Sequence, residues 1–231
     1  MKFVATSVFA AFVAGVSCGT ASAAERPVAN VVELFTSQGC SSCPPANANL
    51  IRLRDRSDVL ALSFAVTYWD QLGWKDTFGR GEYTARQETY EAPLGHDGPF
   101  TPQIVVNGRS DVVGDEMASI EGLLHRGHLS DAPTIAIEGG ALRVGEGSAP
   151  KAGADVWIVR YDPRVQNVPV ARGENAGRTL PHGNVVHALT RIGTWRGEAA
   201  SYPIEAGDPG LRTAVLVQAA HGGPILSAAT D

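Results

Sequence analysis

The sequence predicts an α/β protein in which the order β-α-β-α-β-β-α is followed by a mainly antiparallel β module. Up to about residue 130, runs of β-branched and apolar residues alternate with helix-like segments. From about Asp131 onward, short apolar runs alternate with glycine-rich turns, which is typical of antiparallel strands. These two observations predict an α/β domain at 24–130 and a β-rich C-terminal module at 131–231.

The first part of the α/β region is predicted to be a strand, a helix and a second strand. Residues 28–36, VANVVELFT, are rich in β-branched and apolar residues and predict a buried strand. The helix follows Cys40, where Ser and Pro favour a helix start and ANANLIRLRDR supplies an apolar face. Residues 58–68, DVLALSFAVTY, predict the second strand. This order implies that the two strands are parallel.

The second part adds a helix, a hairpin and a last helix. Residues 81–95, GEYTARQETYEAPLG, predict a helix that is ended by its proline and its final glycine. Two short apolar runs, at 104–106 and 112–113, flank an Asn-Gly pair, which is a strong hairpin signal. Residues 115–129, DEMASIEGLLHRGHL, predict the helix that completes the order.

The first residues are typical of an export signal. Lys2 precedes an apolar run at 3–16 that is too short to span a bilayer, and Ala21-Ser22-Ala23 fits a cleavage site. We therefore expect a signal peptide at 1–23, removal of Cys18 with it, and a secreted or periplasmic protein. The alternative is lipidation at Cys18, but Gly15 stands where a lipoprotein signal would have a Leu-like residue. The formal charge of −5 gives no basic surface for nucleic acid. The sequence contains no second long apolar segment, so we expect no stable membrane insertion of the mature chain.

Cys40 and Cys43 are then the only cysteines of the mature chain, and three interpretations compete. A structural disulfide closing so short a loop contributes only ~2 kcal/mol in the chain-entropy model. A metal site needs further soft or imidazole ligands, and the six histidines lack ligand spacing. At a strand-to-helix junction, Cys40 would instead be an exposed nucleophile of lowered pKa, and Cys43 would resolve the mixed disulfide. The redox interpretation requires no cofactor beyond the disulfide itself.

Three further residues are candidate catalytic groups. A cis peptide between Thr101 and Pro102, just before a predicted strand, would place the backbone of Thr101 beside the cysteines. Glu33 interrupts an otherwise apolar strand that leads into the cysteine loop. It is either a buried proton acceptor for Cys43, with a pKa raised by desolvation, or a glutamate that reaches water or an arginine.

Candidate substrate-binding residues surround the same edge of the predicted sheet. Trp69 and Asp70 follow the second parallel strand, so they lie at the edge where Cys40 lies. They either form a surface that accepts a partner polypeptide or belong to a loop that closes the core. The remaining candidates are the neighbours of the cysteines, Gly39, Ser41 and Ser42. For residues 172–184, RGENAGRTLPHGN, a glycine-rich turn between two strands is favoured over an anion site made by the two arginines.

Residues 28–129 resemble the thioredoxin/glutaredoxin superfamily, whose core arrangement is β-α-β-α-β-β-α. More narrowly, VVELFTSQGCSSCPPAN, YWDQLGWKDTFG, TPQIVVNG and RGENAGRTL resemble a family of secreted thioredoxin-like bacterial proteins that is known only as a domain of unknown function. The resemblance implies a thioredoxin-like domain in which Cys40 and Cys43 are the redox cysteines and Pro102 is the cis proline. Thioredoxins proper carry Trp before the first cysteine and Gly-Pro between the two, whereas this chain has Gly39 and a Ser-Ser pair.

The expected function is therefore an exported thiol–disulfide oxidoreductase that acts on protein or small-thiol disulfides. Such an enzyme needs a redox partner that recycles it. Two alternatives remain open. One is a periplasmic copper-binding or copper-delivery protein that uses the same two cysteines. The other is a non-catalytic binding module in which the two cysteines form a structural disulfide.

Overall fold

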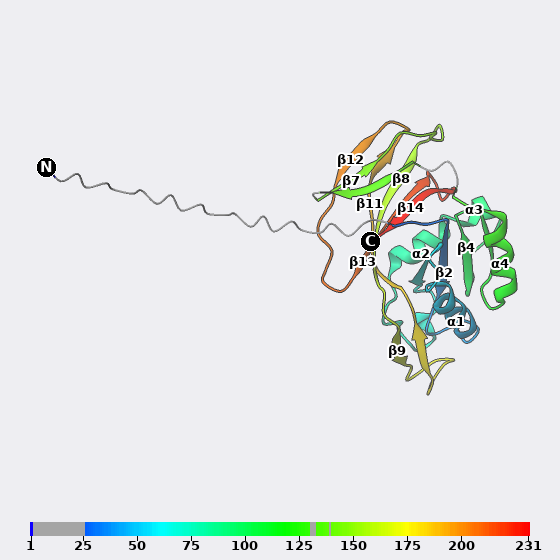
Figure 1. Ribbon diagram of the computed structural model, residues 1–231. Helices are drawn as coiled ribbons and strands as arrows, with labels where there is room; N and C mark the ends of the chain where they lie inside the picture. The colour runs from blue at the N-terminus through cyan, green and yellow to red at the C-terminus, as the bar shows by residue number, and fades with distance from the viewer. Residues whose placement is uncertain (2–25, 130–132, 139) are drawn as a thin grey trace.

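The computed structural model describes Met1 and residues 26–129, 133–138 and 140–231, which form a mixed α/β fold around one large sheet (Figure 1). The sheet has nine strands in the order β1-β14-β13-β8-β11-β3-β2-β4-β5, and most of its neighbouring strands are antiparallel. Apart from Met1, the predicted signal peptide at 1–23 and Cys18 within it lie outside the described residues. No helix within the described ranges is long and apolar enough to cross a bilayer.

The predicted order of strands and helices is found in the first part of the chain, with the predicted helix at 81–95 split in two. The hydroxyl of Thr89 donates to the carbonyl of Arg86 at 2.7 Å, where the first of the two helices ends. Gly95, with a φ of 79°, ends the second. The elements are β2 (Asn30–Thr36), α1 (Pro44–Leu53), β3 (Val59–Ala65), the short 3-10 helix η1 (Asp70–Leu72), α2 (Gly81–Glu88), α3 (Glu91–Leu94), β4 (Gln103–Val106), β5 (Ser110–Val113) and α4 (Met117–Arg126).

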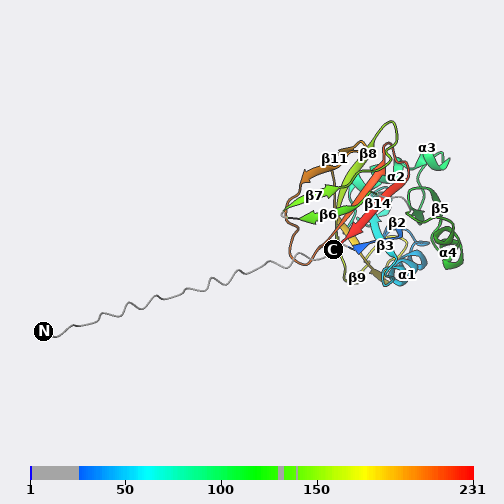
Figure 2. The same ribbon diagram turned by 45° about the horizontal axis from the view of Figure 1, so that its top comes forward.

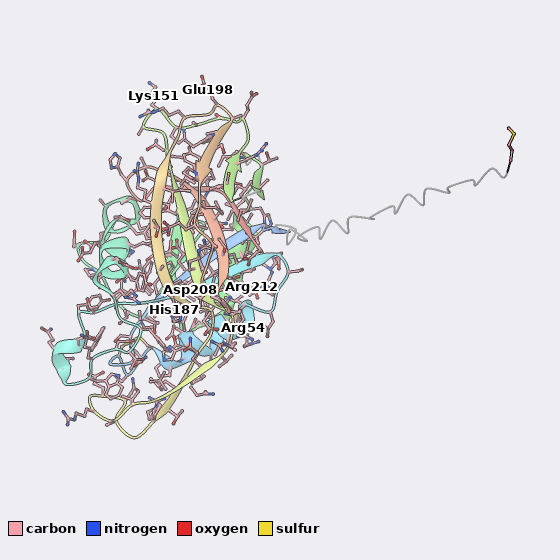
Figure 3. All side chains as sticks on the ribbon, turned by 90° about the vertical axis from the view of Figure 1, so that its left-hand side faces the viewer. Arg54, Lys151, His187, Glu198, Asp208 and Arg212 are labelled. Atoms are coloured by element: carbon pink, nitrogen blue, oxygen red, sulfur yellow. A yellow bond between two sulfur atoms is a disulfide. The ribbon has the colours of Figure 1, made fainter. Side chains whose placement is uncertain are left out.

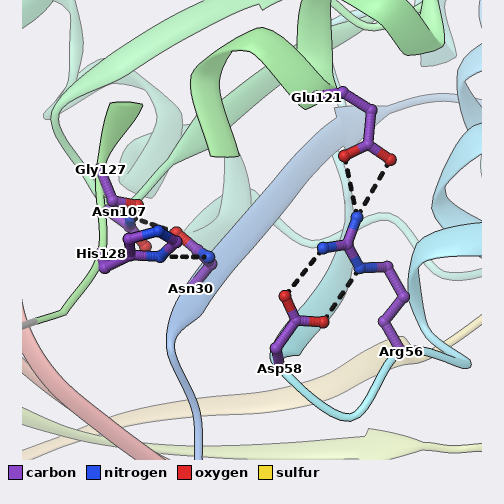
Figure 4. Close-up of polar contacts among 7 residues, drawn as sticks. All are labelled: Asn30, Arg56, Asp58, Asn107, Glu121, Gly127 and His128. Atoms are coloured by element: carbon purple, nitrogen blue, oxygen red, sulfur yellow. Dashed lines mark hydrogen bonds and ion pairs between the residues drawn. The ribbon is translucent and has the colours of Figure 1, made fainter. Parts of the chain in front are cut away.

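The predicted hairpin joins β4 to β5, and its first turn residue also fastens α4 to the sheet. Asn107 and Gly108 have φ angles of 54° and 60°, the left-handed region that an Asn-Gly turn requires. The side chain of Asn107 accepts the N–H of Val31 at 2.7 Å. It also donates to the carbonyl of Gly127 at 3.0 Å, as Figure 4 shows. The hairpin, the start of β2 and the end of α4 are therefore held together by one buried amide.

Arg56 connects helix α4 to the loop that precedes β3. Its guanidinium donates to Asp58 at 2.7 Å and to Glu121 at 2.9 Å, as Figure 4 shows. Because both pairs are partly exposed, they orient the loop more than they stabilise the fold.

The two faces of the sheet bury separate apolar layers. Val32, Leu34 and Ile104 pack against α1 and α4 on one face. Phe35 and Phe64 pack against α2 on the other face, together with side chains of the C-terminal strands. The alternation of side chains along β2 therefore decides which residues meet the helix that follows the cysteines.

The C-terminal part of the chain is antiparallel, as its alternating pattern predicts (Figures 1 and 2). Figure 3 shows Lys151 and Glu198 at the end of this part, well apart from Arg54 and His187. A three-stranded sheet, β12-β7-β6, lies beside its long strands, and β9 and β10 form a separate hairpin. The strands are β6 (Ile135–Glu138), β7 (Ala141–Val144), β8 (Ala154–Asp162), β9 (Gln166–Pro169), β10 (Thr179–His182), β11 (Val185–Trp195), β12 (Ala200–Pro203), β13 (Arg212–Ala219) and β14 (Ile225–Thr230), and β1 (Arg26–Pro27) pairs with β14.

The nine-stranded sheet continues across the predicted boundary between residues 130 and 131. β11 lies parallel to β3, with Val185 opposite Ser63. Asn184 reinforces this junction, since its side chain donates to the carbonyl of Ala61 at 2.8 Å and its own carbonyl accepts the N–H of Ser63 at 3.0 Å. The division into two domains stays a prediction, but the strands on both sides of it share one hydrogen-bonded sheet.

Candidate active site

Cys40 and Cys43 form a disulfide in the loop that joins β2 to α1. The N–H of Cys40 donates to the carbonyl of Ser37 at 3.2 Å, and the N–H of Cys43 donates to the carbonyl of Cys40 at 3.3 Å. Cys43 immediately precedes α1, and Pro44, which has no N–H to leave unpaired, begins the helix. The disulfide therefore lies at a helix N-terminus, where the helix dipole is positive.

The expectation that Cys40 is exposed is wrong for this disulfide-bonded form. Both cysteines have an exposed fraction of 0%, although Ser41 and Ser42 between them are exposed. The hydroxyl of Ser42 lies 3.3 Å from Sγ of Cys40, and the carbonyl oxygen of Thr101 lies 3.9 Å from the same sulfur. The groups around the sulfur come from both near and distant segments, and the spacing within the motif says nothing about the distant ones.

Thr101, Trp69 and Gly39 meet beside Cys40. The peptide between Thr101 and Pro102 is cis, as predicted. The indole N–H of Trp69 donates to the Thr101 hydroxyl at 2.8 Å. A Cβ on Gly39 would lie 3.2 Å from Cβ of Trp69, so the missing side chain allows the tryptophan to approach the cysteine loop. The structure thus brings these predicted site residues together around the disulfide.

The loop after β3 holds Gln38, the residue that precedes Gly39, in place. Asp70 accepts the N–H of Asp76 at 3.0 Å, so its carboxylate orients this loop. Asp76 in turn accepts the N–H of Gln38 at 2.7 Å, and the indole N–H of Trp74 donates to the Gln38 side chain at 2.9 Å. Burial raises the pKa of Asp76 to about 6, although the N–H groups that it accepts act in the opposite direction.

A turn from the C-terminal part of the chain, residues 172–178, also lies against the cysteine loop. It joins β9 to β10, which agrees with the interpretation favoured from the sequence. Asn175 within it is fully buried. Its side-chain amide donates to the carbonyls of Gln38 at 3.0 Å and Cys40 at 2.8 Å. One buried amide therefore satisfies two carbonyls of the cysteine loop.

Glu174 contacts the same loop from the solvent side. Its Oε2 accepts the N–H of Ser41 at 3.1 Å. Hydrogen bonds from the side chain and backbone of Ser41 lower the pKa of Glu174. Sequence reasoning identified neither Glu174 nor Asn175 as a site residue. The only signal was that RGENAGRTL is one of the segments on which the family resemblance rests.

Comparison with known families places all of these residues within one family match. The family described as "Protein of unknown function (DUF1223)" matches residues 31–218. The chain belongs to this family. The matched range contains the disulfide, the cis peptide and the turn at 172–178, so the site lies within the DUF1223 region.

Two solved structures are similar to this DUF1223 protein. A crystal structure of a protein from Agrobacterium tumefaciens, determined by a structural genomics consortium, is 33% identical in sequence, with a TM-score of 0.72. That alignment covers 88% of this chain and 93% of the other. HBP35 of Porphyromonas gingivalis is 13% identical, with a TM-score of 0.56 over 89% of this chain and 75% of the other, which shows similarity of fold alone. A search of the curated proteins found no match.

Glu33 of this DUF1223 protein is paired with an arginine, as one of the two sequence-based interpretations expected. Its side chain is fully buried, and Arg86 donates to Oε1 at 2.6 Å while the hydroxyl of Tyr90 donates to Oε2. β2 presents Glu33 to the face covered by α2, whereas α1, which follows the cysteines, packs on the opposite face. Among the described residues its polar contacts include neither cysteine, and the geometry therefore does not support a role as proton acceptor for Cys43.

His182 is a buried histidine at the end of β10. It is 2% exposed, its ring lies edge-to-face with Phe78 at 5.7 Å, and its Nε2 has no hydrogen-bond partner in the described part of the chain. Burial lowers the pKa of His182 to about 4. It belongs to no metal-ligand cluster, since the described residues contain no group of three or more His, Cys, Asp or Glu placed to hold a metal ion.

We expect the His182→Phe variant to lose less stability than the wild type between about pH 6.5 and pH 4. The unfolded chain binds the histidine proton near pH 6.5, whereas the folded protein binds it only near pH 4, so the wild type loses up to about 3 kcal/mol as the pH falls through this range. Asp76, with a raised pKa, has the opposite effect but is common to both proteins. Urea unfolding at pH 7 and at about pH 4.5 measures how much unfolding free energy the wild type and the variant each lose between the two pH values. Equal losses in the two proteins would contradict the prediction.

Proposed function

We propose that this DUF1223 protein is an exported thiol–disulfide oxidoreductase that acts on protein or small-thiol disulfides. The observation that carries the proposal is the disulfide of Cys40 and Cys43 at a helix N-terminus, with the Thr101 carbonyl 3.9 Å from Sγ of Cys40. The sheet order β3-β2-β4-β5 supports it, with α1 and α4 on one face and α2 on the other. This arrangement agrees with the thioredoxin-like domain that the sequence resemblance implies.

In the proposed reaction, the reduced protein donates two electrons to a substrate disulfide. The thiolate of Cys40 attacks one substrate sulfur, forms a mixed disulfide and releases the other substrate sulfur as a thiolate. The thiolate of Cys43 then attacks Sγ of Cys40, which forms the internal disulfide and expels the second substrate thiolate. The positive end of the α1 dipole favours the thiolate forms of Cys40 and Cys43, which are the nucleophiles of the two steps. A dithiol partner returns the electrons, and the same steps in reverse oxidise a substrate.

The groups that a partner would meet first are the exposed serines between the cysteines and the half-buried Trp69. Because Cys40 has an exposed fraction of 0%, a partner sulfur reaches it only if neighbouring groups move. The Thr101 hydroxyl holds the indole of Trp69 beside the loop. We therefore assign Trp69, Ser41 and Ser42 to the partner-binding surface.

The test is the redox equilibrium of the purified protein against a series of glutathione ratios. We expect a defined midpoint above about −280 mV. The Cys43→Ser variant should accumulate a mixed disulfide through Cys40, whereas the Cys40→Ser variant should accumulate none. The two variants control for each other, because one keeps only the sulfur of Cys40 and the other keeps only the sulfur of Cys43. A disulfide that resists reduction below about −300 mV would instead identify a structural bridge and would overturn the proposal.

A further inference from the structure

We infer that Glu174 is a positioning residue that lowers the reduction potential of the Cys40–Cys43 pair. The inference rests on the proposed function, because it concerns the reduced state of the same two cysteines. The carboxylate lies 133 positions along the chain from Ser41, yet it accepts the N–H of that residue, the first after Cys40, at 3.1 Å. A residue of the C-terminal part of the chain thus places a negative charge one peptide away from the proposed nucleophile.

The position of this charge is fixed by the neighbouring residue. Asn175 is fully buried and donates to two carbonyls of the cysteine loop, at 2.8 and 3.0 Å. Its own Oδ1 accepts from the guanidinium of Arg178 at 2.6 Å. Since Asn175 has all of its amide groups engaged, the turn is held against the loop, and Glu174 is kept beside Ser41.

Reduction of the disulfide is the step that senses this charge. A dithiol partner or glutathione supplies the two electrons that split the bond and is itself oxidised to a disulfide. Cys43 takes up a proton and becomes a thiol, whereas Cys40 is left as a thiolate, which a nearby carboxylate disfavours by like-charge repulsion. Glu174 also occupies the N–H of Ser41, a donor next to the reacting sulfur. Both effects destabilise the reduced state relative to the disulfide, and both therefore lower the reduction potential.

Other charges around the loop act on the sulfur as well and stay unchanged in the experiment. Arg178 is held on Asn175, and Asp76 is held on the N–H of Gln38. The N-terminus of α1 contributes its positive dipole end. Only a substitution at Glu174 isolates the contribution of its carboxylate.

The experiment compares the glutathione equilibrium of wild type and Glu174→Gln, with Glu198→Gln as the matched control. The Gln side chain keeps an acceptor for the Ser41 N–H and removes the charge. Glu198 is equally an exposed glutamate, but it lies at the far end of the C-terminal strands (Figure 3). We expect Glu174→Gln to shift the equilibrium toward the reduced protein about threefold at low ionic strength, and less at 1 M salt. The Cys40 thiol should titrate at lower pH in the same variant.

The outcomes separate the two proposals. A wild-type midpoint that Glu174→Gln leaves unchanged, or moves toward the oxidised protein, overturns the role of Glu174 and leaves the oxidoreductase proposal standing. An equal shift in Glu198→Gln overturns it too, because the effect would then be one of net charge alone. A wild-type protein without a midpoint overturns both proposals.

Discussion

The Arg86→Ala variant is expected to lose about 3–5 kcal/mol of unfolding free energy, because Glu33 would remain in the core as an unpaired charge. The guanidinium is 3% exposed and the carboxylate 0%. Arg86 also donates to the side chain of Gln218 at 3.2 Å and lies 5.6 Å from the centre of the Phe64 ring. Its removal therefore leaves the carboxylate of Glu33 without its counter-charge and the amide oxygen of Gln218 without its donor, and it also removes a cation–π contact.

Urea unfolding of three variants tests this explanation. Arg52→Ala is the control, since Arg52 is an exposed arginine of α1 that makes no hydrogen bond or ion pair through its side chain in the described part of the chain, and we expect a change below about 0.5 kcal/mol. The double variant Glu33→Gln with Arg86→Met removes both charges, and it should lose less stability than Arg86→Ala alone. A double variant that loses as much would show that packing, and not the unpaired charge, explains the loss.

Gly222→Ala is expected to cost about 3–5 kcal/mol, because two separate penalties coincide at this position. Gly222 has a φ of 71°, which L-residues with a Cβ rarely adopt. In addition, a Cβ there would lie 2.7 Å from the carbonyl carbon of Thr89, and closer still to its oxygen. Since the obstacle is backbone at the end of α2, the turn between β13 and β14 must move away from it.

Gly95→Ala separates the two penalties. Gly95 has a φ of 79°, but a Cβ there would meet no atom within 4 Å. We therefore expect this control to lose only about 1–2 kcal/mol, the cost of the left-handed conformation. Equal losses of unfolding free energy in the two variants, measured by denaturant titration, would show that the close approach to Thr89 contributes nothing.

Sequence reasoning succeeds here where the deciding contacts are local. The Asn-Gly pair predicts the turn between β4 and β5 because only residues that tolerate positive φ fit it. The CxxC spacing allows the two sulfurs to meet, and they form the disulfide. The order of strands and helices around them follows from hydrophobic periodicity, which is likewise read from neighbouring residues.

The remainder of the site depends on contacts between distant parts of the chain. Arg86 lies 53 positions from Glu33, and Glu174 lies 133 positions from Ser41. Periodicity and composition contain no information on which distant segments pair, so the sequence left Glu33 with two interpretations and presented 172–178 only as a turn. The burial of Cys40 escaped prediction for the same reason.

The order of strands in the sheet has a consequence for biosynthesis. The chain is made from its N-terminus, but Ser63 of β3 lies opposite Val185 of β11, so the neighbour of this strand is synthesised 185 − 63 = 122 residues later. The interval between synthesis of the two partners is longer still for β1, since its partner is β14. Until those strands exist, the edge of β3 presents unpaired backbone groups that another nascent chain can occupy. This sheet can therefore be completed only after β11, β13 and β14 have been synthesised, and chaperones that bind extended segments are expected to raise its folding yield.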